Sequence, residues 1–260
     1  MMIPKIKKSK VYTVAVLLLL VIAFHNQRIS MIDPENTYPK KIRRAIRLFL
    51  EPPENELDKH LIGKGISCND RTNLYYQAAS ATVLIESRKS IGAGVFISPK
   101  VIVTAAHVIN RRNINVYLLE ISEGALAEPG KPIIIKRVHR IRGLDLAFIV
   151  TKQTGPSWLQ LEKQVTSQNN LMIVGHPKMR YYSLQKARIK KKGLLASSDY
   201  ILFKDNEVFF GNSGGAIVGC NGNLVGIVSM MSNYNNSYLK QGVGINAHAI
   251  STYRRRLKLL

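Results

Sequence analysis

The stretch Gly211-Asn212-Ser213-Gly214-Gly215 stands directly ahead of an apolar run at 216–218 and constrains the fold more than any other part of the chain. Glycines reach backbone conformations that other residues avoid, so the stretch predicts a tight turn leading into a strand. This turn would leave the Ser213 hydroxyl facing outward. A serine hydroxyl is a weak nucleophile unless a base removes its proton and N–H donors stabilise the oxyanion that it creates. A chain built around this serine therefore needs a base and an acid that orients the base.

His107 is the histidine that fits the role of the base. It closes a strand-like, mostly apolar run at 101–106 and is the only histidine so placed. Eight carboxylates lie between His107 and Ser213, and of these only Asp145 lies inside an apolar run, at 144–150. A carboxylate buried there is costly unless a partner compensates its charge. We therefore expect the Asp145 carboxylate to accept a hydrogen bond from the His107 ring.

The order His107, Asp145, Ser213, together with the motifs around these residues, resembles the trypsin-like (chymotrypsin-fold) serine proteases. The resemblance covers roughly residues 75–250. It implies that His107 is the general base, that Asp145 fixes its tautomer and that Ser213 is the nucleophile. It also implies that the N–H groups of Gly211 and Ser213 form the oxyanion hole.

The segments at 224–229 and 242–245 resemble the strands that wall and close the specificity pocket of this family. Glu207 lies six residues before Ser213, where trypsins carry the acid that binds Arg or Lys. The alternative is a surface acid, since a loop of different length would move this carboxylate out of the pocket. The substrate-binding residues that the resemblance implies are Glu207, Phe210, Val228, Ser229 and Met230.

Asn212 departs from the digestive trypsins, in which an aspartate at this position pairs with a newly cut amino terminus. The chain also has no Ile-Val-Gly-Gly activation site, so activation by such a cleavage is not expected. Asn at this position and the 38-residue gap from His107 to Asp145 resemble the bacterial periplasmic proteases of the high-temperature-requirement group. That group usually adds a PDZ domain, but only 47 residues follow Ser213, so no PDZ domain is expected.

Short β-like runs separated by turn residues fill the chain from about residue 73, which predicts an all-β fold. We expect two six-stranded antiparallel β-barrels, at about 73–155 and about 165–247, with the active site in the cleft between them. The expected strands are 81–86, 93–97, 101–104, 114–119, 133–138 and 146–150 in the first barrel and 171–174, 182–189, 200–203, 216–218, 224–230 and 242–246 in the second.

The protease domain predicted in this way spans 73–260 and ends in a short C-terminal helix. The helix is predicted because apolar residues recur at helical spacing from residue 250 onward, with arginines between them. The first barrel would carry His107 and Asp145, and the second would carry Ser213.

Residues 1–10 carry four lysines and no acid, so they are expected to form a basic n-region that stays in the cytoplasm. The run at 11–24 is uncharged. A hydrophobic helix over this run would rise about 21 Å, less than the ~30 Å core of a bilayer, which is typical of a signal peptide. No small-x-small cleavage site follows, which favours an uncleaved signal anchor. We expect a single-pass, membrane-anchored protein whose protease domain lies outside the cytoplasm, periplasmic or extracellular, or a secreted protein if the segment is cleaved.

Residues 25–72 are expected to form a proline-broken linker with a basic amphipathic helix at about 40–50. This helix would lie on an anionic membrane surface or, alternatively, pack against the protease domain as a brace. The net charge of +22 favours acidic partners, although a solvated basic surface is the commoner explanation. No nucleic-acid partner is expected, because the chain lacks a known module and interleaved aromatic residues.

Cys68 and Cys220 are the only cysteines and lie 152 residues apart. In an exported protein they either form a disulfide or remain two free thiols. The six histidines are scattered without the spacing of metal ligands, so no metal is expected. Hydrolysis by an activated serine needs no cofactor, and the sequence carries no signal for an oligomeric state.

The leading functional hypothesis is a serine endopeptidase that hydrolyses peptide bonds of proteins or peptides through an acyl-enzyme intermediate. The rival is a catalytically silent protein of the same fold that binds anionic lipid, polysaccharide or misfolded protein through its basic surface. The presence of His107, Asp145 and Ser213 together argues against the rival, because binding alone does not need all three.

Overall fold

The computed structural model describes residues 68–69, 71–87, 91–109, 114–120, 128–163, 170–177, 181–189, 199–203, 211–233 and 240–259. The chain divides into two compact units, Met1–Pro52 and Pro53–Leu260, and every described residue belongs to the second unit. The predictions for 1–10 and 11–24, and that of an amphipathic helix within 25–72, therefore lie outside the described residues. Within the described ranges, no helix is both long enough and apolar enough to cross a membrane.

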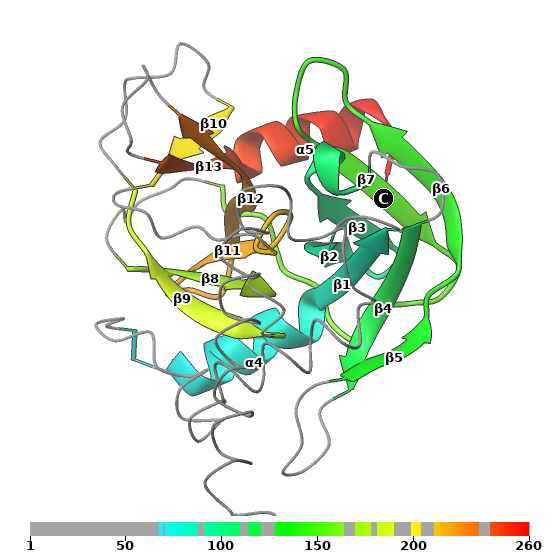
Figure 1. Ribbon diagram of the computed structural model, residues 1–260, viewed down its shortest axis with the longest axis horizontal. Coiled ribbons are helices and arrows are strands. Elements are labelled where there is room, and N and C mark those ends of the chain that lie inside the picture. The colour runs from blue at the N-terminus through cyan, green and yellow to red at the C-terminus, as the bar shows by residue number, and fades with distance from the viewer. Residues whose placement is uncertain are drawn as a thin grey trace, which may run out of the picture. The chain divides into compact units, whose positions relative to one another are not determined.

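The first antiparallel sheet contains seven strands and forms the cyan-to-green part of Figure 1. Its order in space is β5 (Glu128–Pro132), β4 (Ile114–Glu120), β1 (Thr82–Ser87), β2 (Ile91–Ser98), β3 (Val101–Thr104), β7 (Ala147–Thr151) and β6 (Ile135–Arg140). Strands β5 and β6 stand at opposite ends of this order, yet only Ile133 and Ile134 separate them in the chain. The sheet must therefore curve strongly, since its two end strands follow each other so closely in the chain.

The second antiparallel sheet contains six strands. Its order is β10 (Tyr200–Leu202), β13 (Lys240–Asn246), β12 (Leu224–Asn233), β11 (Ala216–Gly219), β8 (Leu171–Gly175) and β9 (Ser183–Ala187). An isolated antiparallel bridge between Ile189 and Phe203 connects the segments that follow the two end strands, β9 and β10.

The predicted architecture is confirmed as a mostly β fold with two antiparallel sheets. The first sheet has seven strands rather than six because β5, which was not predicted, precedes the expected strand at 133–138. The complete closure of each sheet into a six-stranded barrel remains a prediction.

Apolar runs form strands such as β3, β8 and β11, because every residue of these strands is buried. In the first sheet, Val83 and Phe96 pack into a cluster that belongs to this sheet alone. The residues that alternate with these along the strands, such as Leu84 and Val95, belong to a larger cluster with Val174 and other residues of the second sheet. One apolar core is thus shared by both sheets.

Among the described residues, two α-helices flank the sheets. The predicted C-terminal helix is α5 (Ala247–Arg256), whose first turn is capped by the Asn246 side chain, which accepts a hydrogen bond from the Ala249 N–H. The other helix, α4 (Arg71–Ala81), was not predicted. It buries Tyr75 against the shared core although its sequence has no pronounced apolar face.

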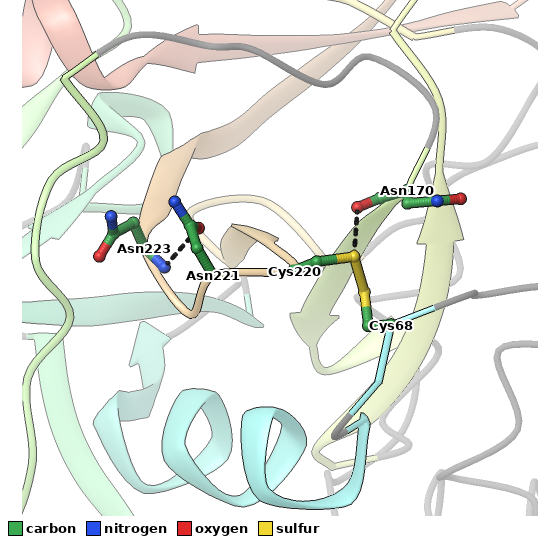
Figure 2. Close-up of a disulfide and its surroundings, with 5 residues drawn as sticks. All are labelled: Cys68, Asn170, Cys220, Asn221 and Asn223. Carbon is green, nitrogen blue, oxygen red and sulfur yellow. Dashed lines mark hydrogen bonds between the residues drawn. A yellow bond between two sulfur atoms is a disulfide. The ribbon is translucent and has the colours of Figure 1, made fainter.

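A disulfide joins Cys68, just before α4, to Cys220, in the turn after β11 (Figure 2). Their Cα atoms are 5.2 Å apart. Because Cys68 precedes the first sheet and Cys220 lies in the second, the bridge closes most of the described chain into one loop.

Replacing both cysteines, Cys68→Ser with Cys220→Ser, should lower the free energy of unfolding by about 2–4 kcal/mol, because the disulfide restricts the unfolded chain. Urea unfolding of the oxidised protein and of the double variant measures the difference. The wild type unfolded in the presence of a reductant serves as the control and should match the double variant. Equal urea midpoints for the oxidised wild type and the variant would show that the bridge adds no stability.

Candidate active site

His107 lies on a short 3-10 helix, η1 (Ala106–Ile109), which begins directly after β3 and Ala105. Val108 and Ile109 are buried and anchor this turn in the core of the first sheet. The Ala106 N–H donates to the backbone oxygen of Asp145 across 3.2 Å. The anchored turn therefore holds the His107 ring, whose side chain is 44% exposed, beside the segment that carries Asp145.

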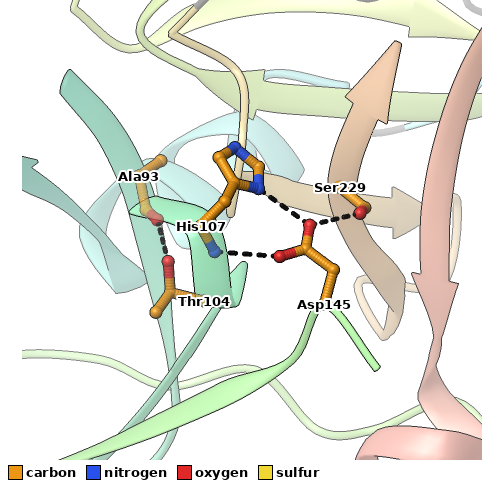
Figure 3. A network of polar contacts seen from close by, with 5 residues as sticks. All are labelled: Ala93, Thr104, His107, Asp145 and Ser229. Carbon is orange, nitrogen blue, oxygen red and sulfur yellow. Dashed lines mark hydrogen bonds and ion pairs between the residues drawn. The ribbon is translucent and has the colours of Figure 1, made fainter. Parts of the chain in front are cut away.

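Asp145 accepts hydrogen bonds from His107 at both carboxylate oxygens (Figure 3). The His107 Nδ1 lies 2.8 Å from Oδ2, and the His107 backbone N–H donates to Oδ1 across 2.9 Å. An ionised carboxylate can only accept, so Nδ1 carries a proton, and in the neutral ring Nε2 is the nitrogen with the lone pair. The expected pairing of Asp145 with the His107 ring is present, and it leaves Nε2 in the form that a general base requires.

The Ser229 hydroxyl donates a third hydrogen bond, 2.5 Å long, to Oδ2 of Asp145 (Figure 3). Burial alone would raise the pKa of Asp145. The hydrogen bonds from His107 and Ser229 and the proximity of the His107 ring outweigh burial and hold this pKa below its ordinary value. Asp145 is therefore ionised at neutral pH.

Sequence reasoning placed Ser229 in the specificity pocket and missed its bond to Asp145. A signal was available: Ser229 is a polar residue in the apolar run of β12, and the structure buries it completely. A buried hydroxyl needs a hydrogen-bond partner. The sequence could not indicate which partner, because Asp145 lies 84 residues away.

Hydrogen bonds of Ser213 and of its neighbour Gly214 lead indirectly to the segments that carry His107 and Asp145. The Ser213 C=O accepts from the Ala93 N–H across 2.7 Å, and the Ala93 C=O accepts from the Thr104 hydroxyl across 2.7 Å, three residues before His107. On its other side, the N–H of Gly214 donates across 2.7 Å to the C=O of Val228, the neighbour of Ser229.

These two routes bring the turn of Ser213 against the segments that carry His107 and Asp145. Among the described residues, no hydrogen bond joins the Ser213 hydroxyl to the His107 ring. The pair of His107 and Asp145 is thus a structural finding, whereas the complete triad is a proposal that is taken up below.

Gly211 and Gly214 have φ angles of +96° and +81°, in the region that side chains disfavour. Steric contacts also require glycine at both positions. A Cβ at Gly211 would collide with the backbone oxygen of His176, and a Cβ at Gly214 would collide with the backbone oxygen of Ala93. Within the described part of the chain, neither the Gly211 N–H nor the Ser213 N–H donates a backbone hydrogen bond. Neither donor is therefore occupied by a backbone acceptor of the described residues.

His176 is a completely buried residue behind this loop. Its Nδ1 accepts from the Tyr182 N–H across 3.2 Å, so Nε2 carries the proton and donates to the Val83 C=O, also across 3.2 Å. Its own backbone N–H donates to the Gly211 C=O across 3.3 Å. Burial lowers the pKa of His176 to about 4, and bonds to backbone carbonyls oppose this only in part.

The remaining predicted site residues are only partly visible. Glu207 and Phe210 lie outside the described residues, as does the side chain of Met230. Val228 is buried and contributes its backbone to the turn of Ser213. In the described ranges, no three His, Cys, Asp or Glu side chains are grouped so that they could hold a metal ion.

The trypsin-like peptidase domain family matches residues 92–227, which is more than half of the chain and includes His107, Asp145 and Ser213. The chain belongs to this family. The resemblance to trypsin-like proteases is thereby confirmed. No curated protein matches this trypsin-like chain.

Solved structures of Rv3671c from M. tuberculosis are similar to this family member in fold. The inactive form of the Rv3671c protease is 21% identical in sequence to this chain, with a TM-score of 0.57. The match covers 70% of this chain and 91% of the Rv3671c chain. The active form of that protease is 21% identical, with a TM-score of 0.58 and coverages of 70% and 82%.

The buried histidine predicts how the stability of this trypsin-like domain changes with pH. Between pH 6.5 and about 4, the unfolded chain takes up a proton at residue 176 while the folded protein does not, so acid favours unfolding. Replacement by asparagine (His176→Asn) should remove roughly 3 kcal/mol of the stability loss over this range. Urea unfolding at pH 7, 5.5 and 4 provides the measurement.

His248 is an exposed histidine on α5, and His248→Asn is the matched control. This control should lose stability in acid as the wild type does. An equally steep loss in His176→Asn would mean that other groups cause the acid sensitivity.

Proposed function

We propose that this trypsin-like protein is a serine endopeptidase that uses Ser213, His107 and Asp145. The Ser213 oxygen attacks the carbonyl carbon of a peptide bond while His107 Nε2 takes its proton. His107 then gives that proton to the leaving amine, which leaves an acyl-enzyme. Water next attacks the acyl-enzyme while His107 takes a proton from it, and His107 returns this proton to the Ser213 oxygen as the acid product leaves. Asp145 stabilises the imidazolium, and the N–H groups of Gly211 and Ser213 stabilise the oxyanion.

The observation that carries this proposal is the His107–Asp145 pair. An ionised carboxylate with three hydrogen bonds fixes one tautomer of the ring, and the side chain that carries the basic nitrogen is 44% exposed. Such an arrangement is useful for moving protons, whereas a surface that only binds ligands has no need of it. The two hydrogen-bonded routes from Ser213 to this pair add support.

Both sheets contribute to the proposed site. His107 and Asp145 lie on segments of the first sheet, and Ser213 precedes β11 of the second. This division supports the prediction of two barrels with catalysis in the cleft between them. The oxyanion donors would then face that cleft, because the opposite side of the loop is packed against the backbone of His176.

Membership of a peptidase family implies protein or peptide substrates. We propose Val228, Met230, Phe210 and Glu207 as residues of the pocket that receives the substrate side chain. Attachment to a membrane through residues 11–24, with the protease domain outside the cytoplasm, also remains a proposal. The same holds for contact of the basic linker at 25–72 with anionic lipid.

Ser213→Ala should abolish labelling by a fluorophosphonate probe, since the probe reacts with an activated serine oxygen. Its thermal melting temperature should stay within about 2 °C of the wild type, because a half-buried hydroxyl contributes little to stability. Labelling detected on a gel and a thermal melt of the same samples provide the measurements.

Ser251→Ala, which changes a serine on α5, is the control and should label like the wild type. Persistent labelling of Ser213→Ala would remove this serine from the mechanism. A wild type that neither labels nor digests casein, yet binds anionic vesicles in a salt-sensitive manner, would favour the catalytically silent alternative.

Asp145→Asn should lower kcat on the order of 10⁴-fold, as the corresponding change does in the trypsin-like template. The amide would present an N–H donor or a neutral oxygen to His107 and would no longer stabilise the imidazolium. The rate of casein digestion measures the effect. Glu162→Gln is the control, because it makes the same change in an acid that bonds to Asn221 instead of to His107. A loss of tenfold or less in Asp145→Asn would argue against the role given to this carboxylate.

A further inference from the structure

The loop of Gly211 and Asn212 is held by two hydrogen bonds from the hairpin formed by β8 and β9. The N–H of His176, at the end of β8, donates to the Gly211 C=O across 3.3 Å. The Asn212 side chain is completely buried, and its Nδ2 donates across 2.6 Å to Oε1 of Gln185 on β9. One bond thus fixes the Gly211 backbone, and the other fixes the next residue through its side chain.

Backbone packing reinforces these two bonds. A Cβ at Gly175, the last residue of β8, would lie 2.7 Å from Oδ1 of Asn212. A Cβ at Gly215 would lie 2.6 Å from the Val174 C=O. The hairpin and the loop therefore approach each other more closely than side chains would allow.

We propose that His176 and Gln185 are positioning residues that hold Gly211 and Asn212 in the conformation that binds the oxyanion. This inference rests on the proposed function, because it assigns a purpose to the two N–H donors of the proposed oxyanion hole. His176 and Gln185 touch no substrate and act through the loop alone.

The loop needs such support because its two donors, Gly211 N–H and Ser213 N–H, flank Asn212. Gly211 has no side chain to limit its conformations, and an ordered glycine loses more entropy than any other residue. Donors stabilise an oxyanion efficiently only when they are already oriented before the reaction. Anchoring the carbonyl of Gly211 and the side chain of Asn212 restrains the chain between the two donors.

His176 is itself immobilised by three parts of the fold. Its ring bonds to the Val83 C=O of β1 and to the Tyr182 N–H of the hairpin. The Tyr182 C=O in turn accepts a 2.7 Å hydrogen bond from the Tyr75 hydroxyl of α4. A displacement of the Gly211 carbonyl would therefore have to disturb the first sheet, the hairpin or α4.

Asn212 stands at the position where the digestive trypsins carry the aspartate that pairs with a newly cut amino terminus, and here its partner is Gln185. Here both partners are part of the folded chain, and their bond involves two neutral amides. The proposed clamp would therefore form during folding and would need no cleavage.

Gln185→Met tests the clamp, because methionine fills a similar volume but cannot accept the hydrogen bond from Asn212. We expect kcat on a fluorogenic peptide derived from a casein cleavage site to fall about tenfold or more, with KM within about twofold, since the loss concerns the transition state. The rate of fluorophosphonate labelling should fall by the same factor. Gln185→Glu retains the acceptor and should recover most of kcat.

Two further comparisons separate positioning from stability. Gln153→Met removes an acceptor from the Ile134 N–H in an exposed loop and should leave kcat unchanged. Tyr75→Phe removes the hydroxyl behind the Tyr182 carbonyl, and Tyr76→Phe changes its exposed neighbour as a control. We expect Tyr75→Phe to lower kcat less than Gln185→Met, with Tyr76→Phe unchanged.

Wild-type kcat in a folded Gln185→Met protein would overturn the proposal, as would a Gln185→Glu variant no better than Gln185→Met. If Tyr75→Phe does not fold, the two Gln185 variants still decide the outcome. Failure of the proposed function gives a different result, because the wild type would then neither label nor cleave the peptide.

Discussion

The Asp145 carboxylate is the charge on which the rest of the site depends. It is 11% exposed, and a charge so buried is tolerated only when hydrogen bonds replace the lost water. The partners come from both halves of the protein: His107 from the turn after β3 and Ser229 from β12. Satisfying one carboxylate therefore brings both sheets together at the place where Ser213 emerges. The same hydrogen bonds keep the acid ionised and the ring in a single tautomer.

Sequence reasoning predicted the features that follow from local patterns or from the cost of an unpaired charge. Asp145 lies in an apolar run, so a partner could be expected, and His107 was the histidine in a comparable setting. The strands followed from their apolar runs and α5 from its helical spacing. These inferences hold because burial and periodicity are properties of the chain itself.

The features that were missed depend on contacts between distant segments. Helix α4 buries small and aromatic residues without a clear apolar face, so it carries no helical signal in its residue pattern. His176 and Gln185 gain their importance from a loop that lies 26 or more residues further along the chain. The β5 strand contains two prolines and a glycine, which are typical of a turn, and it is stabilised by pairing with β4. Only the folded arrangement shows these relationships.

The shared apolar core has a consequence for how the molecule can come apart. Leu84 and Val174 belong to one cluster although 90 residues separate them in the chain. Neither sheet can shield that cluster from water without the other. A fragment containing a single sheet would therefore expose a large apolar surface. Loss of structure should therefore spread through the whole domain as one cooperative event instead of proceeding half by half.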